Sequence, residues 1–207
     1  MSRRAALAGA TGLVGGFLLE RLLADPATAL VCAPTRRPLP SRAKLDNPRL
    51  DGAWALPPID EAYCALGTTR RAAGSAAAFR AVDLDLVAAF AAAARAAGAR
   101  RFGLVSSVGA DAASRFLYPR TKGEAERAVS SGFESVVLAR PSFLLGPRGE
   151  SRPGERLAIA LAKALEPVLP RRWRGVPADA VAAALLRCVR GGVPGVLVLE
   201  NEALGAI

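Results

Sequence analysis

Short apolar runs alternate with segments that carry apolar residues at helical spacing along most of the chain. The first run, residues 4–9, ends in glycine, and helical spacing follows at once over residues 13–25. Apolar runs of this kind predict strands at 4–9, 29–34, 53–56, 61–67, 101–107, 134–141 and 195–200. Helical spacing predicts helices at 13–25, 75–100, 119–132, 154–165 and 177–190.

Strands that alternate with helices predict an α/β fold of the Rossmann type, a doubly wound and mostly parallel sheet with helices on both faces. Such a sheet binds its ligand at the carboxyl ends of the strands. We expect one domain over residues 1–207, in which residues 141–195 contribute a small C-terminal annex on the substrate side. One connection is odd, because only four residues, 57–60, separate the expected third and fourth strands. A parallel crossover needs about a dozen residues, so the third strand is irregular or displaced, or its crossover helix is lost.

The segment AGATGLVGG places Gly9, Gly12 and Gly15 three residues apart between the first strand and the first helix. This context is typical of a dinucleotide-binding loop. The first glycine permits a tight turn, the second lets the pyrophosphate approach the backbone, and the third lets helix and strand pack closely. Free N–H groups at the helix N-terminus attract phosphate, and Thr11 adds a hydroxyl donor. The alternative interpretation is a tight strand-to-helix turn without a ligand.

The end of the second strand carries the signal for the type of cofactor. A site for NAD usually has Asp or Glu there, to bind the ribose 2′-hydroxyl. This chain instead reads APTRRP, with Arg36 and Arg37 and no acidic residue beside them. Guanidinium groups suit a 2′-phosphate, so we expect NADP(H) to be preferred over NAD(H). Two solvated loop arginines are the alternative.

The segment LYPRTKGE places Tyr118 and Lys122 four residues apart, on one face of a helix. A nearby ammonium stabilises a phenolate, which makes the phenol a usable proton donor near neutral pH. Pro119 is compatible with this helix only in its first turn. Ser106 or Ser107, at the end of a predicted strand, can bind the substrate oxygen. An exposed helix pair and a strand-end cap are the alternatives.

Composition and charge exclude several other classes of protein. The chain has no histidine, which excludes a Ser-His-Asp hydrolase and most zinc sites, and we expect no metal site. Three widely spaced cysteines form no disulfide or zinc pattern. The net charge of +10 raises a polyanion as a partner, but the arginines are scattered and aromatic residues are only 5%. We therefore do not expect nucleic acid as a partner. No apolar run is long enough to span a membrane, so we expect no membrane either. The PRRWRG segment at 170–175 contacts an anionic ligand or is a solvated loop.

The motifs GATGLVGG, LGTTRRAAGSAAAFRAVD, GARRFGLVSSVGAD, FLYPRTKGEAE and ARPSFLLGPR resemble the short-chain dehydrogenase/reductase superfamily. The likeness is stronger to its atypical branch of Tat-interacting-protein-like oxidoreductases and their bacterial relatives, and it runs from Arg4 to about Glu202. The resemblance implies a Rossmann fold and NADP(H) binding, with Arg36 on the 2′-phosphate. The short connection before Glu61 departs from the family pattern, where a helix is expected, and leaves the adenine-side wall undefined.

The resemblance also implies roles for individual residues. The catalytic positions would be Ser107, with Ser106 as its close rival, Tyr118 and Lys122. The remaining cofactor-binding positions would be Gly9, Thr11, Gly12, Leu13, Val14, Gly15, Arg36, Arg37, Leu66, Gly67, Thr68, Ser106, Arg140, Pro141, Ser142 and Phe143, and Lys122 would also hold the nicotinamide ribose.

These expectations favour an NADP(H)-dependent oxidoreductase that moves hydride to or from a small carbonyl or alcohol substrate. Dehydratase or epimerase chemistry with a tightly held cofactor is a variant of this hypothesis. The alternative is a non-catalytic NADP(H)-binding sensor or regulatory protein that acts through a protein partner, since few residues follow Arg140 to build a substrate pocket. The basic, apolar N-terminal stretch resembles a signal peptide, but its glycine spacing favours strand, loop and helix. Without an export signal, the cytoplasm is the expected location.

Overall fold

The computed structural model describes residues 2–146 and 170–205, and its centre is a seven-stranded sheet in the order β3-β2-β1-β4-β5-β6-β9. Every neighbouring pair in this sheet is parallel. The strands are β1 (Arg3–Ala8), β2 (Thr28–Cys32), β3 (Leu45–Asp46), β4 (Glu61–Cys64), β5 (Arg101–Val105), β6 (Ser135–Arg140) and β9 (Gly195–Glu200). Two short strands, β7 (Leu144–Leu145) and β8 (Val176–Pro177), pair beside it.

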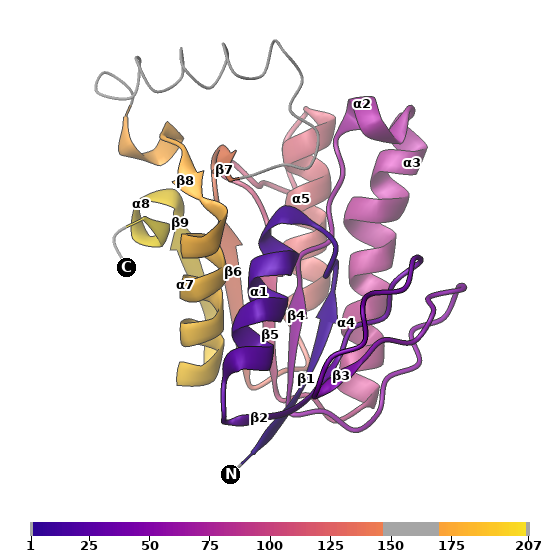
Figure 1. Ribbon diagram of the computed structural model, residues 1–207. Helices are drawn as coiled ribbons and strands as arrows, with labels where there is room; N and C mark the ends of the chain where they lie inside the picture. The colour runs from indigo at the N-terminus through magenta and orange to yellow at the C-terminus, as the bar shows by residue number, and fades with distance from the viewer. Residues whose placement is uncertain (1, 147–169, 206–207) are drawn as a thin grey trace.

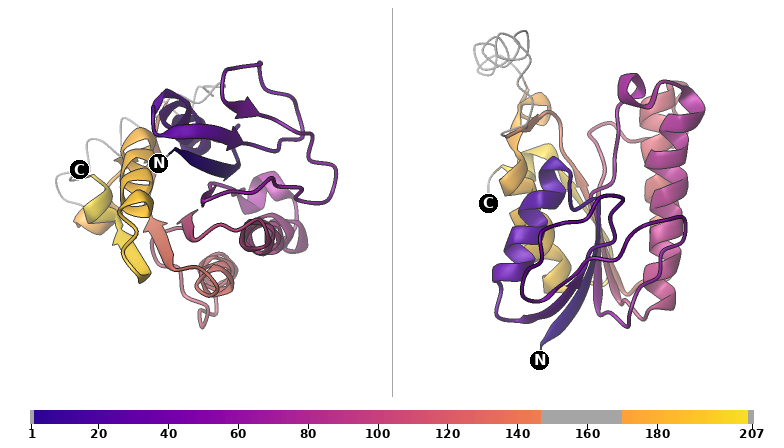
Figure 2. Two further views of the ribbon diagram at one scale, coloured as in Figure 1. Left: turned by 90° about the horizontal axis from the view of Figure 1, so that it is seen from below. Right: turned by 45° about the vertical axis from the view of Figure 1, so that its right-hand side comes forward.

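Helices cover both faces of the sheet, as Figure 1 and the right-hand view of Figure 2 show. One face carries α1 (Leu13–Ala24) and α7 (Ala178–Gly191), and the other carries α4 (Leu86–Ala96) and α5 (Leu117–Val129). Shorter elements are α2 (Arg70–Ala73), α3 (Ala76–Arg80), a π-helical turn at Ala81–Asp85, a 3₁₀ turn at Arg171–Trp173 and α8 (Asn201–Leu204). The predicted doubly wound α/β fold is confirmed.

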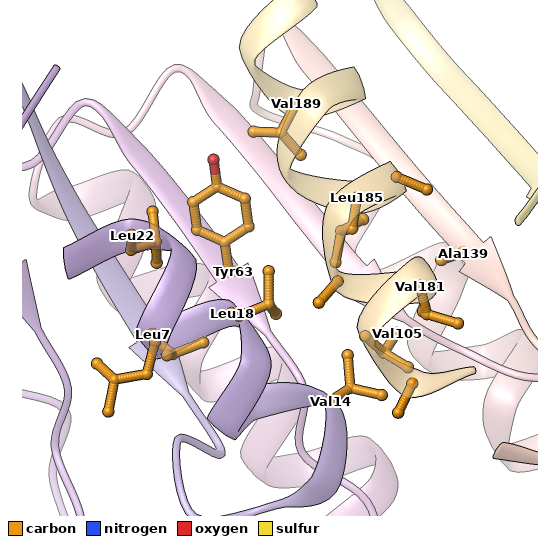
Figure 3. Close-up of a cluster of buried hydrophobic side chains, with 14 of the residues drawn as sticks. Leu7, Val14, Leu18, Leu22, Tyr63, Val105, Ala139, Val181, Leu185 and Val189 are labelled. Carbon is orange, nitrogen blue, oxygen red and sulfur yellow. The ribbon is translucent and has the colours of Figure 1, made fainter. Parts of the chain in front are cut away.

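The central strands β1, β4, β5 and β6 are buried on both faces, and their side chains alternate between two cores. In β1, Ala5 and Leu7 belong to the core under α1 and α7, whereas Ala6 and Ala8 belong to the core under α4 and α5. Figure 3 shows the first core, where leucines of α1 meet Leu185 of α7 over the sheet. Burial of each of these leucines stabilises the folded state by about 1.5–3 kcal/mol. The packed core therefore holds α1 and α7 in place over the sheet.

The third strand differs from its prediction. Residues 53–56 form no strand, and the third strand is Leu45–Asp46, between the strands predicted at 29–34 and 53–56. The crossover from β3 to β4 spans 47–60 and contains no helix. The strand is thus displaced toward the N-terminus, which lengthens the crossover, and the crossover helix is missing. The apolar residues Trp54 and Leu56 pack against the α4 side of the core instead of pairing in the sheet.

The long predicted helix at 75–100 is present but interrupted. It consists of α3, the π-helical turn and α4, and Gly98 follows it with a positive φ of 93°. The π-helical turn places the side chain of Asp83 in the interior. In a regular helix this side chain would point in a different direction. The predicted helix at 119–132 begins two residues earlier, at Leu117, so Pro119 lies in its first turn as required. The predicted helix at 154–165 lies outside the described residues.

Arg190 of α7 joins three elements at the end of the sheet away from the glycine loop. Its Nε lies 3.2 Å from Glu61 Oε1, its Nη2 donates to Thr28 Oγ1 at 2.7 Å, and its guanidinium also pairs with Asp25. Glu61 is fully buried, and this burial raises the pKa of its carboxyl group. Without Arg190, this buried carboxylate would lose its ion pair.

We therefore expect Arg190→Met to lower the free energy of unfolding by about 3–5 kcal/mol, since breaking a buried ion pair leaves an unpaired charge. Urea titration measures the loss. The raised pKa of Glu61 means that the folded state binds the proton more tightly, so the variant gains stability as the pH falls through that pKa. Adding Glu61→Gln should recover part of the loss and remove this pH dependence. A loss below about 1 kcal/mol at neutral pH contradicts the assignment.

Candidate functional site

The sheet order reverses between β1 and β4, and the glycine loop lies at the carboxyl ends of these strands. Gly9 has a φ of 84°, and a Cβ atom there would lie 2.6 Å from the carbonyl oxygen of Ala65. A Cβ atom at Gly15 would lie only 1.9 Å from the carbonyl oxygen of Gly9. Glycine is therefore required at both positions, the first for the turn beside β4 and the second for the contact between helix and turn.

The first turn of α1 presents backbone N–H groups without a side-chain cap. Gly12 is the N-cap residue, has no capping side chain, and donates its own N–H to Gly9 O at 2.9 Å. The backbone N–H groups of Leu13, Val14 and Gly15 follow in this turn, where intrahelical acceptors are lacking. Thr11 is exposed beside them. An uncapped helix N-terminus beside glycines fits a pyrophosphate, so the residues present fit a dinucleotide.

A cavity of about 100 Å³ continues from the glycine loop toward the end of β2. Arg36 and Arg37 line it together with residues of the glycine loop, of the β4 end and of the crossover, namely Gly9, Thr11, Pro34, Thr35, Leu50, Trp54 and Leu66. Both arginine side chains are exposed. The structure thus brings the two arginines and the glycine loop to one cavity.

Asn47, a residue that sequence reasoning missed, holds the loop that carries these arginines. Its Nδ2 donates to Ala33 O at 2.5 Å and to Thr35 Oγ1 at 2.9 Å. Its Oδ1 accepts from the Leu39 N–H at 2.7 Å. The side chain therefore ties both sides of the arginine loop together from the residue that follows β3.

Tyr118 and Lys122 lie on one face of α5, one helical turn apart. Tyr118 is 43% exposed, and its ring stacks on the buried Phe79 of α3 with 5.6 Å between centroids. Lys122 is buried, and its Nζ lies 2.6 Å from Asp83 Oδ1. The Tyr118 side chain is thus partly exposed, whereas the Lys122 ammonium is buried in an ion pair.

Asp83 is a site residue that sequence reasoning missed. It is fully buried, and its second carboxylate oxygen accepts the Thr68 N–H at 2.8 Å. A Cβ atom at Gly67 would lie 3.5 Å from its Oδ1 and 3.6 Å from Lys122 Nζ. One carboxylate therefore joins the loop after β4 to the lysine of α5. A charged residue within an apolar helical segment could have indicated this buried ion pair from the sequence.

The two candidate serines have different partners. Ser106 Oγ donates to the buried Glu126 Oε1 at 2.5 Å, which commits its hydroxyl away from the opening. Ser107 Oγ has only a long 3.4 Å contact, to Val108 O. The geometry favours Ser107 as the hydroxyl that remains available to a ligand.

Glu126 also binds Arg140, another predicted cofactor residue. Arg140 donates Nε and Nη2 to Glu126 at 2.9 and 2.6 Å, and Nη1 to Glu200 at 2.9 Å. Hydrogen bonds to Glu126 raise the pKa of the Arg140 guanidinium. This network ties α5 to the ends of β5, β6 and β9. It holds the residues around Ser107 in place rather than extending a free cation toward a ligand.

The residues after β6 run toward the substrate side of the site. Pro141 O accepts the Val108 N–H at 2.9 Å, which joins this segment to the loop after β5. Ser142 donates its N–H to Asn201 Oδ1 and its hydroxyl to Trp173 O, and Phe143 is 74% exposed. The PRRWRG segment therefore lies beside Ser142. Part of the expected substrate side, residues 147–169, lies outside the described residues.

Two other kinds of feature are absent from the described residues. No group of three or more His, Cys, Asp or Glu side chains there is arranged to hold a metal ion. Within the same residues, no helix combines the length and apolar character that crossing a membrane requires.

Comparison with curated proteins finds relatives over nearly the whole chain, although no protein-family model matches it. The mitochondrial protein fmp52 of Emericella nidulans is 39% identical over 209 residues, 91% of this chain and 90% of its own. Protein HTATIP2 of Rattus norvegicus is 38% identical over 211 residues, 95% of this chain and 85% of its own.

Comparison with solved structures supports the fold. MoeE5 in complex with UDP-glucose and NAD superposes with a TM-score of 0.71 at 21% identity, covering 95% of this chain and 75% of that one. At this identity the likeness concerns the fold alone.

The relatives also correct the expected location. Several fungal relatives are named as mitochondrial proteins, which contradicts a cytoplasmic location. The cytoplasmic prediction is therefore wrong. The prediction rested only on the lack of an export signal. The absence of one targeting signal does not show which other compartment a protein occupies.

The sequence motifs, the doubly wound sheet and the relatives agree. Identity of 38–39% over more than nine-tenths of the chain exceeds what a shared fold alone produces. The chain belongs to the family of HTATIP2 and fmp52, in the atypical branch of the short-chain dehydrogenases/reductases.

Proposed function

We propose that this protein is an NADP(H)-dependent oxidoreductase that acts on a small carbonyl or alcohol substrate. The observation that carries the proposal is the arrangement on α5, where the buried Lys122 ammonium lies one turn from the exposed Tyr118 phenol. Ser107, at the adjacent end of β5, keeps its hydroxyl available. A dinucleotide-binding loop opens at the same edge of the sheet.

Each of these side chains has a distinct part in the proposed reaction. The bound cofactor supplies or accepts the hydride. Tyr118 donates a proton to the carbonyl oxygen during reduction and accepts it back during oxidation. Lys122 stabilises the phenolate that remains and binds ribose hydroxyls, while Ser107 donates a hydrogen bond to the substrate oxygen. The Tyr118 ring stacks on the buried ring of Phe79, which supports it.

The proposed preference for NADP(H) is supported by the cavity beside the glycine loop. Arg36 and Arg37 both line it, and their side chains are exposed. A guanidinium group binds a phosphate with paired, charge-assisted hydrogen bonds. Asn47 holds the loop in the shape that points both residues to this cavity.

The proposal places the substrate on the side of residues 141–195. Exposed Phe143 and Trp173 offer apolar surface in the described part of this annex. The segment Pro141–Phe143 would lie beside the nicotinamide, because it follows β6 directly and is joined to the loop after Ser107.

A panel of aldehydes and ketones tests the proposal. The purified protein should oxidise NADPH only when a carbonyl substrate is added. The decrease in nicotinamide absorbance measures this oxidation. Tight NADPH binding with no turnover across aliphatic, aromatic and sugar carbonyls would contradict the enzymatic proposal. That result would instead support a regulatory protein that senses the cofactor.

The two serines are expected to separate cleanly by mutation. Ser107→Ala should lower kcat by about 10²–10³-fold, the usual effect of removing a donor to a reacting oxygen. Ser106→Ala should change kcat much less, because its hydroxyl is bound to Glu126, and should instead lower stability by about 1 kcal/mol. Steady-state kinetics and thermal unfolding of both variants make the comparison. The reverse order of the kinetic effects would assign the role to Ser106.

A further inference from the structure

The crossover at 47–60 brings a tryptophan into the wall of the cavity beside the glycine loop. Trp54 lines this cavity together with Gly9, Leu66 and the two loop arginines. A helix is the ordinary connection between parallel strands, but this crossover contains none. The side of the cavity that a crossover helix would cover is therefore formed by irregular chain and one indole ring.

The indole ring has a fixed orientation. It packs edge-on against Phe90 of α4, with 4.9 Å between ring centroids and an interplanar angle of 62°. Leu56, two residues later, packs against the same core. The crossover is thus anchored to α4 by two side chains, of which Trp54 also lines the cavity.

The polar atom of this ring lacks a protein partner. Trp54 Nε1 is buried and makes no hydrogen bond. Buried indole N–H groups usually have an acceptor, and one without a partner calls for an explanation. This N–H lies in the ring plane and is not accessible, so a ligand in the cavity would meet the ring of Trp54 rather than its N–H.

We propose that Trp54 is the aromatic wall of the adenine-binding part of the cofactor site. This inference rests on the proposed function, because it assumes that the ligand is NADP(H). The adenine ring would lie between the indole on one side and the arginine loop on the other. Bases stack favourably on aromatic rings and on guanidinium planes. Trp54 thereby takes over a role that the missing crossover helix leaves open.

Trp54→Ala tests this with adenine-containing and adenine-free ligands. The probes are NADPH, 2′,5′-ADP and nicotinamide mononucleotide, measured by calorimetry. Loss of one stacking ring weakens the binding of a base by about 5- to 150-fold, so we expect this loss for NADPH and 2′,5′-ADP and none for nicotinamide mononucleotide. Trp54→Phe keeps a ring and should retain most of the affinity.

Leu56→Ala is the matched control for a purely structural role. Leu56 packs against the same core from the same crossover. If Trp54 served only packing, both alanine variants would lower the melting temperature and affect 2′,5′-ADP binding equally. We expect a loss of affinity in Trp54→Ala alone, and equal losses would overturn the inference.

Fluorescence gives a second measurement, because the chain has only two tryptophans. In Trp173→Phe the remaining emission comes from Trp54, and 2′,5′-ADP should quench it. In Trp54→Phe the emission comes from Trp173 and should not change. Normal NADPH binding without these effects would overturn the inference and leave the proposed function intact. If the unmodified protein bound neither NADPH nor 2′,5′-ADP, the proposed function itself would fail.

Discussion

Tyr118→Phe is expected to lower kcat by about 10²–10⁴-fold, the usual contribution of a positioned acid–base group. The substitution removes only the phenol hydroxyl. The ring that remains keeps its stacking on Phe79, and Lys122 keeps its ion pair with Asp83. Binding of NADPH should therefore stay within about twofold of that of the unmodified protein, because no cofactor contact is assigned to the hydroxyl.

Steady-state turnover and an NADPH titration on the same preparation separate the two effects. Phe79→Leu serves as a companion variant, since it disturbs the ring support while leaving the hydroxyl in place, and it should reduce turnover less. Undiminished turnover in Tyr118→Phe would remove the tyrosine from the proposed chemistry. A parallel loss of cofactor binding would show that the variant disturbs the site rather than the proton transfer.

Gly15→Ala is expected to weaken NADPH binding by about 5- to 150-fold. A Cβ atom at this position would lie 1.9 Å from the carbonyl oxygen of Gly9, so either the helix or the loop must move. Overpacking of this kind typically costs about 1–3 kcal/mol. If cofactor binding requires the original loop conformation, the protein has to return to it at the same cost in free energy. That cost corresponds to the expected increase in Kd of about 5- to 150-fold.

Gly16→Ala is the matched control for Gly15→Ala. A Cβ atom at Gly16 has only an ordinary contact, 3.9 Å from Ala10 O. Alanine in a helix interior is favoured over glycine by about 1 kcal/mol, so this variant should be as stable as the unmodified protein or more so. Equal NADPH binding by the two alanine variants would contradict the role given to the close contact at Gly15.

Local patterns predicted most of the fold because their causes are local. The apolar run of β1 predicts a strand whose side chains are buried on both faces. The glycine turn is predicted by three glycines spaced three residues apart. The Tyr118 and Lys122 pair shares a helix face through spacing alone, and Pro119 fixes where that helix begins. These features need no knowledge of distant parts of the chain.

The features that the sequence did not reveal depend on contacts between distant segments. The two-residue β3 has too few apolar positions for a periodicity, and it exists because Val31 and Cys32 offer it a parallel edge. The partners Asp83 and Lys122 are 39 residues apart in the printed sequence, and a π-helical turn brings them together. The choice between Ser106 and Ser107 likewise required the position of Glu126.

We propose that the glycine loop and Arg36 together bind NADP(H). Titrating the purified protein with NADPH and with NADH at matched moderate salt, followed by nicotinamide fluorescence, tests it most directly. We expect micromolar NADPH binding, much weaker NADH binding, and loss of most of that difference in Arg36→Ala. Equal binding of both cofactors would contradict the role of Arg36, and binding of neither would mean that the glycines form only a turn.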